Sequence, residues 1–407
     1  MRSILRTAVV VAASLLLVPQ FVAAADLGSE IQDMKQRLEA MEGQLQTQSA
    51  DLTDARAMVA AQQVQIDQTE TLVNDEREAT SALSSFLEST DISGFVAAGW
   101  NYIDPNTDVD DDETDGFNLD QAWITINKAA TAESRAGFNL EFQMGELAQE
   151  GVGFGNSDVI GIYAASVSYL APVGNGLMVD AGILSTALGA EVEAQNGNWQ
   201  ITRGAVFGLQ PITNTGVTAT YNLTDSISVM AGALNNALAT DRNNAGDTLG
   251  LTSQVSYSQD KFGLNVGYNY GSSGPNGAAR DGLLDVVATL DVTDNLSAWV
   301  NYDYATNTLA NGNDGDSTQG IAIAGRLAVM EGTGISGRFE YVSTETGTGV
   351  ENRNTKTYTV TVDRAITAGL TGKFEYRYNS NDYDANGAAI SVGNGSSVIA
   401  TQLLYQF

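Results

Sequence analysis

The chain of 407 residues contains no histidine, no cysteine and only 5 prolines. Without imidazole and thiolate groups, the usual protein metal sites and the Ser–His and Cys–His nucleophile pairs are excluded. The lack of cysteine also excludes a disulfide framework. The sequence therefore predicts no catalytic residues, no metal site and no cofactor.

Basic residues are scarce as well. There are 19 Lys and Arg against 49 Asp and Glu, which gives a formal charge of −30. Nucleic acid is excluded as a partner because phosphate binding needs clusters of Lys and Arg.

No apolar run reaches the roughly 20 residues that a membrane-spanning helix needs. The N-terminus carries Arg2 and Arg6, the 12-residue run TAVVVAASLLLV, Pro19 and three alanines at 23–25. A charged start, a short apolar stretch and small residues at a cleavage site are typical of a secretory signal peptide. We expect residues 1–25 to be removed on export, the alternative being a membrane anchor.

A heptad repeat follows the expected cleavage site. Eight of its nine a positions are apolar, and no proline interrupts residues 26–90. This pattern predicts a periplasmic α-helical coiled coil over 26–90, whose strand number the mixed a and d residues leave open. The alternative is a single helix packed on a globular core, which the polar remainder of the segment disfavours. The a positions are Ile31, Leu38, Leu45, Leu52, Val59, Ile66, Val73, Thr80 and Leu87.

From residue 91 onward, apolar and polar residues alternate with a period of two. In GFNLEFQMGEL, Phe138, Leu140 and Phe142 share one face, and Glu141 and Gln143 share the other. The segments GLNVGYNYG, GIAIAGRLAV and LTGKFEYRYNS alternate in the same way. Segments of about 9–11 alternating residues are long enough to cross a bilayer as tilted strands.

Short and long connections take turns between these segments. Seven are short, from TAES at 131–134 to TAG at 367–369, and eight are long, including a stretch near 188–214 and SNDYDANGAAISVGNGS at 380–396. This arrangement predicts an all-β transmembrane barrel of about 16 antiparallel strands over 91–407, with short turns in the periplasm and long loops outside.

The chain ends on SVIATQLLYQF, in which Leu403, Tyr405 and Phe407 lie on one apolar face of the expected strand. We expect this strand to close the barrel against ISGFVAAGWNYI, because an open sheet edge is not tolerated in lipid. Aromatic residues recur at strand ends, as in the interfacial girdles of membrane barrels. A soluble β-sandwich, the alternative, needs no such girdles.

Several of these segments resemble the OmpL-like β-barrel porin family. They are GFNLDQAWITINK, VSYLAPVGNGLMVDAGIL, NWQITRGAVFGLQPITNTGVTATYNLTDSISVMAGALNN and DVVATLDVTDNLSAWVNYDYA, followed by LLYQF. The resemblance implies a passive outer-membrane diffusion channel. Similarity to outer-membrane proteins in general implies that Leu403, Tyr405 and Phe407 carry the signal read by the barrel-assembly machinery.

Parity along the strands places a charged set inside the barrel. By analogy with other 16-stranded porins, we expect the third long loop, near 188–214, to fold into the lumen, with its acids facing basic residues on strands 12, 13 and 15. The alternative is that these residues form solvated cross-strand pairs. The candidate constriction and lumen residues are Glu141, Glu191, Glu193, Arg203, Arg326, Arg338, Glu340, Lys373, Glu375 and Arg377, with Gln143, Asp285 and Asp303 on the same wall.

The function expected from this pattern is a porin for small hydrophilic solutes and ions. A mild cation preference is predicted because residues 91–407 hold 36 acids and 13 bases, a net charge of −23. Expected partners are membrane lipid, lipopolysaccharide, the barrel-assembly machinery and two further copies of the chain. A tether whose coiled coil approaches the peptidoglycan is the alternative. An outer-membrane enzyme is disfavoured because the known types of barrel enzyme use a histidine in the active site, and this chain has none.

Overall fold

The computed structural model describes residues 27–104, 114–145, 160–235, 238, 249–273, 279–308, 314–347, 351–385 and 388–407. The expected signal peptide lies outside these residues. The chain divides into two units, Met1–Ser84 and Ser85–Phe407, which are treated separately below.

The helix α1 (Leu27–Glu88) is 62 residues long. The large apolar residues of its heptad stripe, among them Leu38, Leu45 and Val59, are 40–66% exposed in the single chain. Within the described ranges, no helix combines the length and the apolar character that crossing a membrane requires. The stripe that the sequence shows is thus present on α1 and uncovered within one chain.

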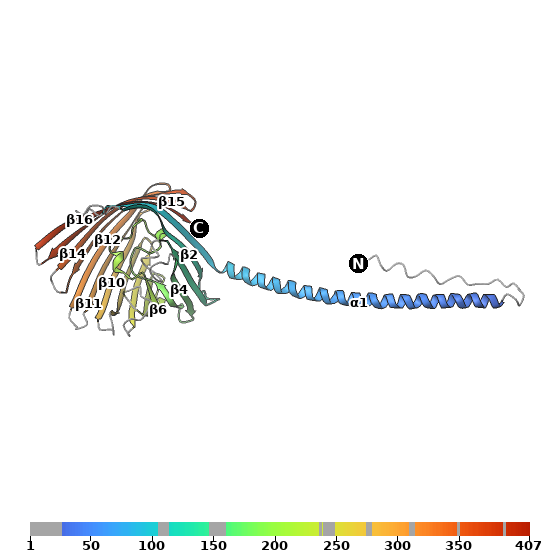
Figure 1. Ribbon diagram of the computed structural model, residues 1–407. Helices are drawn as coiled ribbons and strands as arrows, with labels where there is room; N and C mark the ends of the chain where they lie inside the picture. The colour runs from blue at the N-terminus through green and yellow to red at the C-terminus, as the bar shows by residue number, and fades with distance from the viewer. Residues whose placement is uncertain are drawn as a thin grey trace. The chain divides into compact units, whose positions relative to one another are not determined.

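The second unit is a closed barrel in which each strand pairs antiparallel with its sequence neighbours and β16 pairs with β1. The prediction of sixteen antiparallel strands is confirmed. Figure 1 shows the strands side by side in the barrel wall. The strands are β1 (Asp91–Asp104), β2 (Thr114–Lys128), β3 (Ala136–Met144), β4 (Ile160–Ala171), β5 (Leu177–Ser185), β6 (Thr213–Asn222), β7 (Ile227–Leu234), β8 (Gly250–Gln259), β9 (Phe262–Ser273), β10 (Ala279–Thr293), β11 (Leu296–Thr308), β12 (Asp314–Met330), β13 (Thr333–Glu345), β14 (Glu351–Thr367), β15 (Leu370–Ala385) and β16 (Ala388–Gln406).

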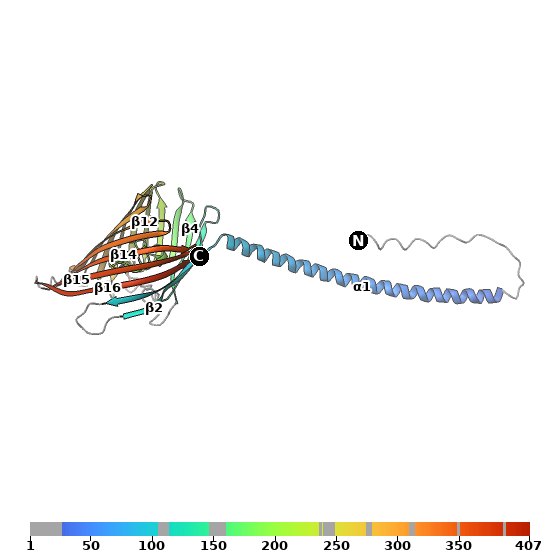
Figure 2. The same cartoon turned by 90° about the horizontal axis from the view of Figure 1, so that it is seen from above.

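The barrel closes where the sequence predicts. The β1–β16 ladder runs from Phe95 opposite Gln406 to Asp104 opposite Ser397. Beyond it, the backbone N–H of Phe407 donates to the carbonyl of Gly94 at 3.0 Å, and Gly94 N–H donates back at 3.1 Å. Figure 2 shows the red C-terminal strands beside the teal first strands, as this ladder requires.

The alternation on β16 also matches the prediction. Leu403, Tyr405 and Phe407 are 50–59% exposed on the outer face, whereas Gln402 and Leu404, each one position before Leu403 and Tyr405, are buried. An apolar outer face and a polar inner one follow from the period of two, because successive side chains point to opposite sides of a strand.

The short turns lie where the sequence places them. Gly332 and Gly369 adopt positive φ angles of 68° and 80° in two of the short turns, a conformation that glycine adopts without steric cost. Strand lengths vary more widely than the 9–11 residues expected: β3 and β5 have 9 residues, but β7 has 8 and β14–β16 have 16–19.

The stretch at 380–396 is the clearest correction. It was expected to be a long loop, but β15 continues to Ala385 and β16 begins at Ala388, with Asn381 opposite Asn394 and Ala385 opposite Ala388. Two strands that continue pairing satisfy each other's backbone groups, so the ladder has no need to stop at the membrane boundary. The many Gly, Asn, Asp and Ser residues of this stretch, which predicted a loop, therefore lie in a paired extension of the two strands.

Candidate functional site: the loop inside the barrel

The connection between β5 and β6, residues 186–212 and hereafter the lumen loop, lies inside the barrel (Figure 1). It contains two short 3-10 turns, Gln195–Gly197 and Phe207–Leu209. Inward-facing side chains of β2, β3, β8, β11, β13, β15 and β16 all hydrogen-bond to it. The loop is thus fastened to the wall on opposite sides of the lumen.

Arg338 on β13 connects the loop to the wall through charge. Its guanidinium is fully buried, forms an ion pair with Glu191 of the loop and lies 3.2 Å from Glu340. It also donates to the carbonyl of Thr202 at 2.9 Å. One cation therefore serves two buried carboxylates, one from the loop and one from its own strand.

Glu191 of the loop is buried, so its environment disfavours the charged form of its carboxyl group. Burial raises the pKa of its carboxyl group, while the neighbouring Arg338 opposes that rise. The Gly204 N–H adds a second stabilising contact by donating to Glu191 at 2.8 Å. The ionised form of Glu191 hence depends on these two partners.

The carboxylate of Glu375 on β15 binds loop backbone directly. It accepts from the N–H of Ile201 at 2.6 Å and from the N–H of Thr202 at 3.0 Å. Glu340 plays the same part for Val206 N–H at 3.0 Å. Carboxylates that bind backbone N–H groups form charge-assisted hydrogen bonds, which are about twice as strong as neutral ones.

Two cations of β15 satisfy loop carbonyls. Lys373 Nζ donates to Asn198 O at 2.7 Å, and Arg377 Nη1 donates to Arg203 O at 2.7 Å. These cations and the acids of β13 and β15 are therefore bound to the loop instead of facing an open aperture.

The local sequence ITRGAVFG lets the loop approach this wall. A Cβ atom at Gly204 would meet the carboxylate groups of Glu340 and Glu191. Only a residue without a side chain leaves room for both carboxylates and for the hydrogen bond from its own N–H.

Glu193 and Arg203 form a pair within the loop. Arg203 Nε lies 3.1 Å from a Glu193 carboxylate oxygen, and Gln143 on β3 donates to the other at 2.7 Å. The Arg203 guanidinium also lies over the Phe207 ring, 5.5 Å from its centroid. The sequence predicted that Glu193 would face basic residues of the wall, but its cation belongs to the same loop.

Asp285 and Asp303, opposite each other on β10 and β11, reach the loop through amides. Gln210 of the loop donates to Asp303 at 2.7 Å, and Asn301 donates to Asp285 at 2.7 Å while accepting from Ala190 N–H at 3.0 Å.

The remaining two candidates take different positions. Arg326 pairs with Asp363 of β14, with Nη2 and Oδ2 2.6 Å apart. The sequence predicted an acid of the loop as its partner, but Asp363 is a wall residue. Glu141 accepts from Asn139 at 2.7 Å and lines two cavities of about 300 and 180 Å³ beside the loop.

Sequence reasoning missed a set of neutral amides that hold the loop on the side of β2 and β16. Gln402 donates to Gln195 at 3.0 Å and to Asp120 at 2.7 Å. Gln121 accepts from Gln195 N–H at 3.0 Å. A β-bulge, seen as a register shift opposite Ala97 and Ala98, turns Asp120 and Gln121 inward together.

An apolar cluster inside the barrel was missed as well. Phe95 and Trp123 stack with ring centroids 6.2 Å apart, and Tyr163 packs on Trp123 at 4.5 Å. Ala194 and Ile212 of the loop pack against the cluster. Tyr163 sits at a second bulge, where Glu141 pairs with Ala164 and Phe142 with Ile162. A strict period of two does not reveal bulges of this kind.

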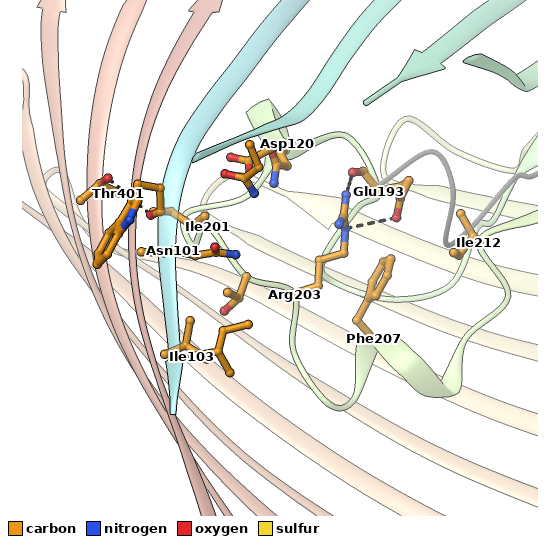
Figure 3. A pocket seen from close by; sticks show the side chains of 15 residues that line it. Asn101, Ile103, Asp120, Glu193, Ile201, Arg203, Phe207, Ile212 and Thr401 are labelled. Atoms are coloured by element: carbon orange, nitrogen blue, oxygen red, sulfur yellow. Dashed lines mark hydrogen bonds and ion pairs between the residues drawn. The ribbon is translucent and has the colours of Figure 1, made fainter. Parts of the chain in front are cut away.

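A cavity of about 520 Å³ remains between the lumen loop and the strands β1, β2 and β16. Figure 3 shows Asn101, Ile103 and Thr401 on its strand side, and Arg203 and Phe207 on its loop side. In the described part of the chain, no three His, Cys, Asp or Glu side chains gather as a metal site requires.

A closed 16-stranded barrel with an apolar outside and a polar inside is the architecture of porin-like outer-membrane barrels. The family model described as "Putative beta-barrel porin-2, OmpL-like" matches residues 89–407. The chain belongs to this OmpL-like porin family, and the expected family and outer-membrane location are confirmed.

Solved structures share the fold at low sequence identity. An anion-selective porin from Comamonas acidovorans matches with a TM-score of 0.57 and 12% identity, over 78% of this chain and 99% of that one. OmpT of Vibrio cholerae, in its trimer form, matches with a TM-score of 0.55 and 15% identity, over 78% and 99%. The outer-membrane channel DcaP of Acinetobacter baumannii matches with a TM-score of 0.55 and 9% identity, over 78% and 97%. No curated protein sequence matches the chain.

Proposed function

We propose that the protein is a passive diffusion channel for small hydrophilic solutes and ions. The observation that carries this proposal is the cavity left between the lumen loop and one side of a closed barrel whose inner wall is polar. Family membership supports the same function. The lumen loop, with the wall residues of β13 and β15 that bind it, forms the constriction.

We also propose a mild preference for cations. It is supported by the net charge of −23 over residues 91–407, since negative potential at the mouths concentrates cations. The full-length protein in planar bilayers should conduct ions. Under a salt gradient, the sign of the reversal potential should be that of a cation-selective channel. The opposite sign would remove the cation preference alone, whereas a protein that inserts without conducting would remove the channel function.

The proposed partners follow from the outer face of the barrel. Membrane lipid and lipopolysaccharide surround the wall, and the exposed residues Leu403 and Tyr405 on β16, with Phe407 directly after it, form the signal for the barrel-assembly machinery.

We propose further that three copies assemble and that their α1 helices form a coiled coil in the periplasm. The uncovered heptad stripe on α1 supports this proposal, because an apolar a/d stripe is buried only against another helix. The trimer form of the Vibrio cholerae neighbour supports the number three.

The stripe can be tested inside the full-length chain. Leu45→Asp together with Leu52→Asp places charges in the seam and should lower the helix melting temperature and weaken the trimer in native mass measurements. Ala50→Asp, which adds a charge at an outward f position, serves as the control. Equal behaviour of the two variants would contradict the coiled coil.

A structural tether is a second candidate for the periplasmic part. The 62 residues of α1 give a helix of about 93 Å at 1.5 Å per residue. This length favours a spacer that reaches toward the peptidoglycan, and co-sedimentation of the full-length protein with peptidoglycan tests it. Tether and channel can be combined in one molecule.

A further inference from the structure

Most of the lumen charges identified from sequence are engaged away from the 520 Å³ cavity. Arg338 binds Glu191 and Glu340, and Glu375 binds loop backbone. None of these four residues is among those lining the 520 Å³ cavity, which lies on the side of β1, β2 and β16. The affinity of a solute in that cavity is therefore set by other side chains.

The charged residues that border the cavity, Arg203, Glu193 and Asp120, carry a net negative charge. Arg203 is paired with Glu193, and Asp120 accepts from Gln402 at 2.7 Å. An anionic solute would lose its hydration there without gaining an opposite charge. An uncharged solute avoids that penalty.

The remaining lining combines hydrogen-bonding groups with an apolar surface. Asn101 and Asn118 offer amides, and the buried Oδ1 of Asn118 has no hydrogen-bond partner in the described part of the chain. Ile103, Val398 and Phe207 supply the apolar surface. Hydroxyl groups satisfy such amides, and the C–H faces of a sugar ring pack on such apolar side chains.

We propose that this cavity is a solute-binding site for uncharged polyhydroxylated molecules of one or two sugar rings. The volume of 520 Å³ lies within the range of about 300–1,000 Å³ of small-molecule sites. The inference rests on the proposed channel function and names its solute class. Asn118 is the specificity-determining residue, because its unpartnered acceptor binds a hydroxyl donor.

Single-channel recording of the full-length protein tests the site. Glucose or maltose added on one side should interrupt the current in a concentration-dependent manner. Gluconate, which has a similar size but carries a negative charge, should need higher concentrations. Asn118→Ala should raise the half-blocking concentration of glucose about fivefold, the effect of losing one hydrogen bond of about 1 kcal/mol.

Asn127→Ala is the matched control. Asn127 lies on the same strand, but its amide bonds to Asn139 at 3.3 Å and it is not among the cavity's lining residues, so the half-blocking concentration should not change. Equal effects of the two variants, stronger block by gluconate than by glucose, or a sugar-insensitive open channel would overturn the inference.

Ligand-observed NMR with glucose and the detergent-refolded protein separates this inference from the channel function. Binding that Asn118→Ala weakens, in a protein that does not conduct, would support the site and reject the channel. Conduction without glucose binding would support the channel and reject the site.

Discussion

The two sides of the lumen loop are held by different kinds of contact. Toward β13 and β15, buried charges dominate, with Arg338 between two carboxylates and Glu375 on two backbone N–H groups. Toward β2 and β16, the loop is held by the side-chain amides of Gln121 and Gln402 and by packing of Ala194 on an aromatic cluster.

This difference has an energetic consequence. Removing one partner of a buried ion pair leaves an uncompensated charge and costs about 3–5 kcal/mol, whereas a neutral hydrogen bond contributes about 1 kcal/mol. The charged side therefore fixes the position of the loop, and the neutral side can yield. The 520 Å³ cavity lies on the neutral side, where small displacements of the loop would widen it at the lowest cost.

The largest expected effect comes from removing the cation of the charged side. Arg338→Met leaves Glu191 and Glu340 buried without their cation, which should lower the folding stability by about 3–5 kcal/mol. We expect the loop to detach from β13, which should raise the single-channel conductance and increase current fluctuations. Planar-bilayer recording of the refolded variant measures both.

Arg326→Met is the control for this experiment. Arg326 is also a lumen arginine in an ion pair, but its partner Asp363 belongs to the wall. We expect a change in ion selectivity without a rise in conductance. Identical conductance changes in the two variants would show that net charge, and not the fastening of the loop, controls the current.

A smaller effect is expected when the same contact is disturbed sterically. In Gly204→Val the side chain would collide with the carboxylates of Glu340 and Glu191, so the loop must shift away from β13. Gly208→Val adds the same side chain where the first atom, Cβ, meets nothing within 4 Å. Conductance should rise in the first variant and stay unchanged in the second, and a rise of equal size in both would refute a tight contact at Gly204.

Much of the barrel was predictable from sequence because its signals are local. A period of two defines each strand, and the alternation of short and long connections gives the count of sixteen. The same parity placed Arg338, Glu340 and Glu375 inside the barrel, where each contacts the lumen loop. Side-chain direction in a strand depends only on position, so no knowledge of the fold was needed.

The pairing of these residues was not predictable, because it depends on register and on the path of the loop. A bulge changes the parity of every later residue in its strand, so Asp120 and Gln121 both point inward and Trp123 joins the apolar cluster. Glu193 could have met any cation in the lumen, and only the folded loop brings it to Arg203. The bulge in β4, where Tyr163 is the extra residue, was likewise not predictable from a strict period of two.

The smallest effect is expected on the neutral side. Gln402→Leu removes the donor to Gln195 and Asp120 while keeping a side chain of similar size, at a cost of about 1–2 kcal/mol. Because Gln121 still holds Gln195, the loop should stay in place, with open-channel noise raised and mean conductance changed less than in Arg338→Met. Ser168→Ala removes a hydrogen bond between two wall residues, Ser168 and Asp180, and should leave the noise as it is. If Gln402→Leu raised the conductance as much as Arg338→Met, both sides would hold the loop equally, and the distinction between a fixed and a yielding side would be wrong.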